Sequence, residues 1–148
     1  MKNLRVYLHS KAKLDKREVH KIVKNITSYL DLKIISLEIN FMNSEQIHKM
    51  NVEHLGHDYS TDIITFNYSE ELSKLDGEIF ISLEDAKFNS KKFDVLFENE
   101  VVRLIIHGIL HMIGYDDQKP ADKRKMKKKE NELVAKIWNR SFKGFVKL

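Results

Sequence analysis

The feature that most constrains the fold is a long apolar helical pattern that contains two histidines. Its C-terminal part, "LIIHGILHMIGY", is interrupted by two histidines and two glycines and is too short to cross a bilayer. The pattern therefore predicts a buried central helix from about Asp94 to Met112, ended by Gly114, because glycine takes the left-handed conformation at a helix C-terminus without penalty. Its predicted apolar face consists of Leu96, Phe97, Val101, Leu104, Ile105 and Ile109.

The two histidines have the spacing of metal ligands. His107 and His111 are four residues apart, so a helix points both imidazoles to one side, and the turn after Gly114 lets Asp117 approach the same ion. The chain has no cysteine, so only nitrogen and oxygen ligands are available. Two histidines and a carboxylate leave an open position, as in catalytic zinc sites, although iron and manganese accept the same set. We expect one zinc ion here.

Other interpretations of these residues stay open. His107 and His111 can be buried histidines whose hydrogen bonds are satisfied within the core. Asp116 or Asp117 can cap the last helix, and Asp116 can replace its neighbour as the ligand, although the spacing favours Asp117.

A comparison with the zinc-protease signature H-E-x-x-H-x-x-G-x-x-H indicates the kind of reaction. Gly108 stands at the position of the glutamate, and Asp117 stands at that of the last histidine. The glutamate moves the proton in peptide hydrolysis, which glycine cannot do. A metal with nearby cationic groups can polarise a phosphoryl oxygen and activate water, so phosphodiester cleavage does not require that glutamate.

The rest of the chain predicts one α+β domain over residues 1–148, with about four strands in a mixed sheet packed with helices around the histidine helix and a helix–turn like that of the zinc proteases. No linker or repeat divides it, and Pro120 is its only proline. Periodicity predicts strands near 4–8, 35–41, 61–68 and 77–82, and further helices at 15–30, from 43 or 44, at 84–92 and from 120.

The charge is concentrated in one segment. The chain carries +4 in total, but residues 119–129 hold seven Lys or Arg and one Asp, so the remainder sums to −2. Such a patch indicates a polyanionic partner, nucleic acid before membrane, although a solvated helix face explains it equally well. The N-terminus lacks the apolar core of a signal peptide, and the absence of cysteine suits a reducing compartment, so we expect a cytoplasmic protein.

Three blocks of residues resemble the YbeY family, metal-dependent single-strand endoribonucleases of bacterial ribosomal RNA maturation. The family signature H-G-x-L-H-x-x-G-Y-D-H is matched at 107–117, with Asp117 in place of the last histidine. A block from Asn51 to Phe66 and the strand at 77–81 also match. The resemblance implies an rRNA-processing enzyme, associated with ribosomes and acting on 16S rRNA 3′ ends and in ribosome quality control, with zinc at His107, His111 and Asp117 and with neither DNA nor a membrane as partner.

The chain departs from the family at a position that contacts phosphate. The family's arginine falls on Leu55, its aromatic neighbour is His54, and the closing proline is Asn67. We therefore expect His57, two residues beyond the lost arginine, or a lysine of the basic segment to approach the phosphate. A polar loop is the simpler explanation of His57. Two other functions remain: a non-catalytic ribosome-assembly or RNA-binding factor with a fold-stabilising metal, and a metallopeptidase in which a carboxylate such as Glu78 replaces the missing base.

Overall fold

A four-stranded mixed sheet forms the centre of the protein, as the sequence predicts. The computed structural model describes residues 3–57 and 61–148. The strand order is β1-β3-β5-β4, in which β1, β3 and β5 are parallel and β4 runs antiparallel to β5. The strands are β1 (Leu4–Leu8), β3 (Lys33–Met42), β4 (Ile63–Asn67) and β5 (Lys74–Ser82).

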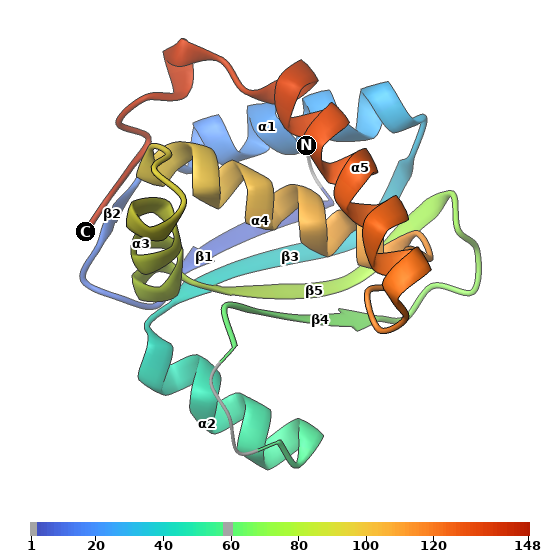
Figure 1. The fold of residues 1–148 in the computed structure, drawn as a ribbon, viewed down its shortest axis with the longest axis horizontal. Coiled ribbons are helices and arrows are strands. Elements are labelled where there is room, and N and C mark those ends of the chain that lie inside the picture. Colours follow the sequence, from blue (N-terminus) through green and yellow to red (C-terminus); the bar gives the residue numbers. More distant parts are fainter. Residues whose placement is uncertain (1–2, 58–60) are drawn as a thin grey trace.

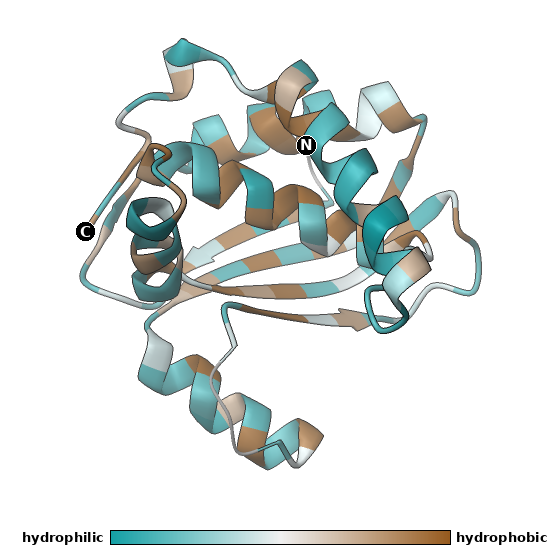
Figure 2. Ribbon diagram, in the orientation of Figure 1, coloured by the Kyte–Doolittle hydropathy of each residue, from teal (hydrophilic) through white to brown (hydrophobic). Residues whose placement is uncertain are grey.

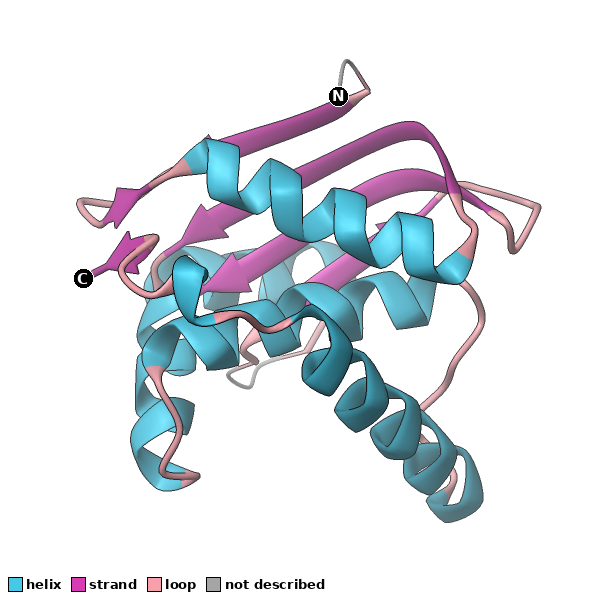
Figure 3. Ribbon diagram, turned by 90° about the horizontal axis from the view of Figure 1, so that it is seen from above, coloured by secondary structure: helices cyan, strands magenta, loops and turns pink. Residues whose placement is uncertain are grey.

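Helices cover both faces of this sheet unequally. The helices α1 and α4 lie on one face, α2 lies on the other, and α3 and α5 pack against α4 (Figure 1). Seen from above, α1 lies over the strands and crosses them obliquely (Figure 3). The helices are α1 (Lys16–Leu30), α2 (Ser44–Leu55), α3 (Leu83–Lys92), α4 (Phe97–Met112) and α5 (Pro120–Ile137).

The helix α4 is the buried centre of the fold. Eleven of its residues are buried, and it packs against β4, β5, α3 and α5. It begins at Phe97, later than the sequence pattern predicts, because Asp94 has a left-handed backbone (φ 53°) and Leu96 is extended. The apolar stripe therefore extends past the helix into the turn before it.

Two local features differ from the sequence prediction. Ile35 is 44% exposed, because a register irregularity between Ile34 and Ser36 interrupts the strict alternation expected in this strand. A small second sheet of β2 (Lys13–Leu14) and β6 (Val146–Lys147) was not predicted, since two-residue strands carry too little alternation to detect.

The last helix combines an apolar face with a highly charged one. Most of α5 is hydrophilic in Figure 2, and its buried side packs on α4. The buried residues are Met126, Glu130, Leu133, Val134 and Ile137. One acidic side chain therefore lies on the apolar face, directed into the molecule.

In the part of the chain that the structure describes, no helix is both long enough and apolar enough to cross a lipid bilayer.

Candidate metal centre

The structure brings His107, His111 and Asp117 together. Each offers one ligand atom, and these atoms lie within 4.8 Å of one another. The Oδ2 atom of Asp117 is 3.7 Å from Nε2 of His107 and 3.5 Å from Nε2 of His111. Two imidazole nitrogens and a carboxylate oxygen in one group can hold a metal ion and suit zinc, iron or manganese.

A buried carboxylate holds His107 in the orientation that ligation needs. Nδ1 of His107 lies 2.9 Å from Oε2 of Glu130, which is buried on α5. Although burial alone raises the pKa of a carboxyl group, hydrogen bonds from His107 and Arg103 lower the pKa of Glu130 to about 2. An ionised Glu130 can only accept, so His107 donates from Nδ1, and Nε2 is the nitrogen that faces Asp117 and would bind a metal.

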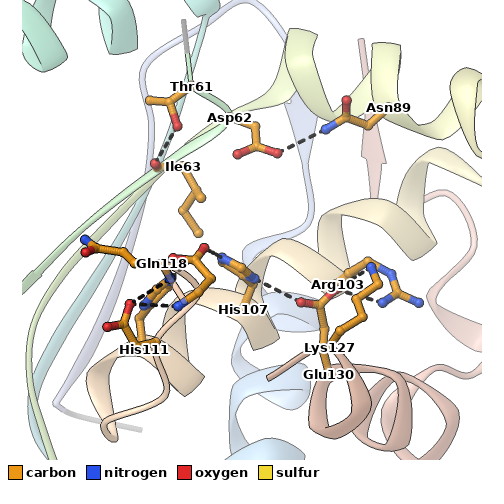
Figure 4. Close-up of polar contacts among 12 residues, drawn as sticks. Thr61, Asp62, Ile63, Asn89, Arg103, His107, His111, Gln118, Lys127 and Glu130 are labelled. Carbon is orange, nitrogen blue, oxygen red and sulfur yellow. Dashed lines mark hydrogen bonds and ion pairs between the residues drawn. The ribbon is translucent and has the colours of Figure 1, made fainter. Parts of the chain in front are cut away.

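Glu130 is itself held by cations. Nη1 of Arg103 donates to Oε1 of Glu130 at 2.7 Å and to Oδ1 of Asn131 at 2.8 Å. Nζ of Lys127 lies 3.4 Å from the same glutamate oxygen. Dashed contacts in Figure 4 run from His107 through Glu130 to Arg103. The buried negative charge is therefore paired, which offsets the cost of its desolvation.

The loop after α4 orients the third ligand. Gly114 has φ 103° and its N–H donates to the carbonyl of His111, so the chain leaves the helix immediately after the second histidine. Oδ1 of Asp116 then accepts the N–H groups of Asp117 at 2.7 Å and Gln118 at 3.2 Å. Asp116 shapes the turn, and Asp117 belongs to the metal-ligand group.

Gly108 is a packing position facing the sheet. A Cβ atom there would come within 2.9 Å of Cδ1 of Ile79 and 3.2 Å of Cδ1 of Ile63. A side chain at 108 would require the buried side chains of Ile79 and Ile63 to shift. The missing glutamate of the protease signature would therefore displace the core between α4 and the sheet.

Glu78 does not replace that glutamate. It accepts a hydrogen bond from the hydroxyl of Tyr68 at 2.8 Å, and it lies between Gly77 and Ile79 on β5. Because neighbouring residues of a strand point to opposite faces and Ile79 faces α4, Glu78 faces away from the histidines. The structure gives no support to the peptidase alternative.

A cleft of about 490 Å³ opens beside the metal-ligand group. His107 and Asp117 line it, and so do Lys123 and Lys127 of α5. Four carboxyl groups line it, those of Asp62, Glu100, Asp117 and Glu130. The remaining lining residues are Asn89, Phe93, Val95, Arg103, Leu104, Met126 and Asn131.

Burial raises the pKa of two of these cleft carboxyl groups, Glu100 and Asp62. Burial raises the pKa of Glu100 to about 7. Burial also raises the pKa of Asp62, an effect that the nearby His107 and a hydrogen bond from Asn89 at 3.1 Å partly oppose. The cleft beside the metal-ligand group is therefore less negative at neutral pH than its residues suggest.

Sequence comparisons show which family the chain belongs to. Residues 6–138 match the family described as endoribonuclease YbeY. The endoribonuclease YbeY of Bacteroides fragilis is 40% identical over 122 residues, which cover 82% of this chain and 87% of that protein. That of Flavobacterium johnsoniae is 43% identical over 116 residues, covering 74% and 83%. The chain belongs to the YbeY endoribonuclease family.

A solved structure supports the fold of this YbeY family member. A protein of Thermotoga maritima, determined in solution, superposes with a TM-score of 0.66 over 91% of this chain and 89% of its own. The two sequences are 23% identical, so the likeness concerns the fold alone.

The structure describes only part of the second block that matches the YbeY family, residues 51–67. Asn67, which replaces the family's proline, donates from Nδ2 to the carbonyl of Met112 at 3.1 Å and so ties β4 to the end of α4. Leu55 ends α2 and is 41% exposed. The N–H of His57 donates to the carbonyl of Asn51 at 3.1 Å. His57 is not among the described residues lining the cleft, and its role stays a prediction.

Sequence reasoning missed Glu130 and Arg103, the residues that support His107. A signal for Glu130 was present, because the spacing of Met126, Leu133 and Ile137 puts position 130 on the apolar face of α5. Nothing comparable marked Arg103, since its partners come from another helix.

Proposed function

We propose that this YbeY endoribonuclease cleaves single-stranded RNA with one zinc ion held by His107, His111 and Asp117, and that residues 1–148 act as one nuclease domain. The observation that carries the proposal is the three-donor group, with His107 oriented by Glu130, beside a cleft flanked by lysines.

The residues of the chain have separable parts in such a reaction. A bound zinc ion would polarise the phosphoryl oxygen and lower the pKa of a water molecule. Glu130 accepts a hydrogen bond from Nδ1 of His107 and keeps Nε2 available for ligation. Lys123 and Lys127 attract the RNA backbone to the cleft. Asp117 brings a negative charge that a third histidine would not, so the centre is less electrophilic.

We extend the proposal to ribosomal RNA in the cytoplasm, with maturation of 16S rRNA 3′ ends on ribosomes as the process. Family membership supports it, as does the lysine-rich α5, which suits a polyanion. The exposed Leu55, standing where the family has an arginine, is the observation that favours a second candidate, a non-catalytic RNA-binding factor.

His57 remains our candidate for the phosphate contact that Leu55 cannot make. It follows the C-terminal Gly56 of α2, two residues beyond the leucine. Replacing His57 with alanine should slow cleavage of single-stranded RNA, and unchanged cleavage would remove this role.

The function is tested with the zinc-loaded protein and a His111→Ala variant, each incubated with single-stranded RNA, duplex RNA and an unstructured protein. We expect cleavage of single-stranded RNA alone, lost in the variant. Equal RNA binding without cleavage by either protein would favour the binding factor. Proteolysis would favour a peptidase instead.

A further inference from the structure

The mouth of the cleft carries an exposed aromatic ring. Phe93 follows the last residue of α3, lines the cleft and is 60% exposed. The next residue, Asp94, has a left-handed backbone, and the N–H of Val95 donates to the carbonyl of Ser90 at 2.9 Å. This turn holds Phe93 and Val95 at the cleft. Exposure of a large apolar side chain there does not stabilise the fold, so it calls for another explanation.

An exposed aromatic ring beside a phosphodiester-cleaving centre suits a nucleobase. Single-stranded RNA is commonly held by stacking its bases on aromatic side chains. The ammonium group of Lys92 lies 5.5 Å from the centroid of the Phe93 ring, so a positive charge stands next to the ring. The ring therefore lies where a base next to a bound phosphate can reach it.

The wall of the cleft supplies hydrogen-bond acceptors at a suitable distance. Glu100 lies seven residues before His107 on α4, which corresponds to about 10 Å along the helix axis. Asp62 lines the same cleft and interacts electrostatically with both residues. Carboxyl oxygens accept hydrogen bonds from the exocyclic amino groups of bases. A nucleotide with its phosphate at the histidines can thus direct its base toward these groups.

The charges of the cleft favour a nucleotide over an apolar protein segment. Lys123 and Lys127 lie one turn apart on α5, and both line the cleft. A chain that threads between them and the histidines must be polyanionic to benefit from both cations. An apolar peptide bound here would bury the carboxyl groups of the wall without hydrogen-bond partners, which is costly.

We propose that this cleft is a nucleobase subsite, in which one base of the RNA strand stacks on Phe93 and donates hydrogen bonds from an exocyclic amino group to Asp62 and Glu100. The proposal rests on the proposed nuclease function and goes beyond it by naming a nucleobase next to the scissile bond as a group that the protein recognises. Adenine, guanine and cytosine carry the amino group and uracil does not, so the subsite disfavours uracil.

Stacking is tested by comparing two phenylalanines. Phe88 of α3 is 68% exposed but lies outside the residues that line the cleft, so Phe88→Ala is the matched control. We expect Phe93→Ala to lower kcat/KM on single-stranded RNA about 5- to 100-fold, the range for loss of one stacked base, and Phe93→Tyr to restore it. Equal rates for the two alanine variants would overturn the proposal.

A spectroscopic measurement separates the subsite from the nuclease activity. RNA oligonucleotides carrying 2-aminopurine at successive positions are bound to metal-free protein, so that no strand is cut. We expect the fluorescence to fall at one position, with the change lost in Phe93→Ala and kept in Phe88→Ala. If the zinc-loaded protein cuts no RNA but this change is found, the nuclease function fails and the subsite stands. If cleavage occurs without any such change, the subsite fails alone, and if neither occurs, both fail.

Base preference is tested with four oligonucleotides that differ only at that position. We expect uracil to give a kcat/KM at least about 5-fold below the other bases, as expected for one lost hydrogen-bonded contact. Glu100→Gln introduces an amide that can also donate to a uracil carbonyl. The difference in kcat/KM between uracil and the other bases should therefore be smaller in this variant. Equal cleavage of all four by the unmodified protein would overturn the amino-group recognition.

Discussion

Nδ1 of His107 on α4 lies 2.9 Å from Oε2 of Glu130 on α5, and this contact joins the two helices. Because Glu130 stays ionised, it fixes the tautomer of the histidine. The lysine-rich helix therefore has a second role, since it also supplies the carboxylate that orients a ligand.

The first prediction concerns that contact. Glu130→Gln removes the charge that orients His107 and should weaken zinc binding about 10- to 100-fold. Glu132→Gln is the control, because Glu132 is ion-paired to Lys129 at 2.8 Å and is not part of the site. Competition with a chelating dye measures both affinities. Equal zinc affinity in the two variants would show that Glu130 serves packing only.

The second prediction concerns the pH dependence of stability. Burial raises the pKa of Glu100 from 4.5 to about 7, so stability falls as the pH rises from about 4.5 to about 7, and the full penalty is present above pH 7. Below about pH 4.5 the carboxyl is protonated in both states and the penalty vanishes. Glu100→Gln should therefore increase the free energy of unfolding of the metal-free protein at pH 8, by up to about 3 kcal/mol, and have little effect at pH 4.

Urea unfolding at the two pH values measures this difference. Glu53→Gln, on the exposed surface of α2, is the control and should change stability equally little at both. A Glu100→Gln variant with the same stability gain at pH 4 and pH 8 would contradict the assigned acidity.

The third prediction concerns Gly108. Alanine is the better helix former, but its Cβ would collide with Ile79, and overpacking a core costs about 1 to 3 kcal/mol. Gly108→Ala should therefore lower the free energy of unfolding. Combining it with Ile79→Val, which removes the nearest methyl group, should recover part of the loss in a double-mutant cycle. Simple additivity of the two changes would argue against this contact.

The fourth prediction concerns the third ligand. Asp117→His replaces a charged ligand with a neutral one and should make a bound metal more electrophilic. The rate profile for RNA cleavage should then shift to lower pH. Asp117→Ala is the comparison and should lose both zinc affinity and cleavage. An unchanged pH profile in Asp117→His would contradict the electrostatic argument.

The fifth prediction separates the two sides of α5. Lys123 and Lys127 line the cleft, whereas Lys125 and Lys128 of the same helix do not. Neutralising the first pair with glutamine should weaken RNA binding and reduce the slope of log affinity against log salt by about 1 to 2. The second pair should have a smaller effect. Equal losses for the two pairs, from titrations at several salt concentrations, would indicate a diffuse electrostatic surface.

Much of the fold and of the metal-ligand group could be predicted from local sequence signals. Local patterns predicted the four long strands and the five helices: apolar periodicity for most of them, and short β-rich runs between Gly, Ser and Asp for β4 and β5. The spacing of His107, His111 and Asp117 predicted a common site, since one helical turn and one glycine turn determine their approach. These features depend on residues close together in the chain.

Other features needed the tertiary structure. In the sequence, Gly108 stands where a protease has its general base, but only the approach of Ile79 from β5 shows that a side chain there would crowd the core. Glu130, Arg103 and the cleft with Phe93 depend on the packing of α3, α4 and α5 against one another. The sequence by itself determined the chemistry of the metal ligands, because they follow one another along a helix and its turn. What orients His107 and what surrounds the metal-ligand group were decided by contacts between segments distant in the chain, which no local spacing encodes.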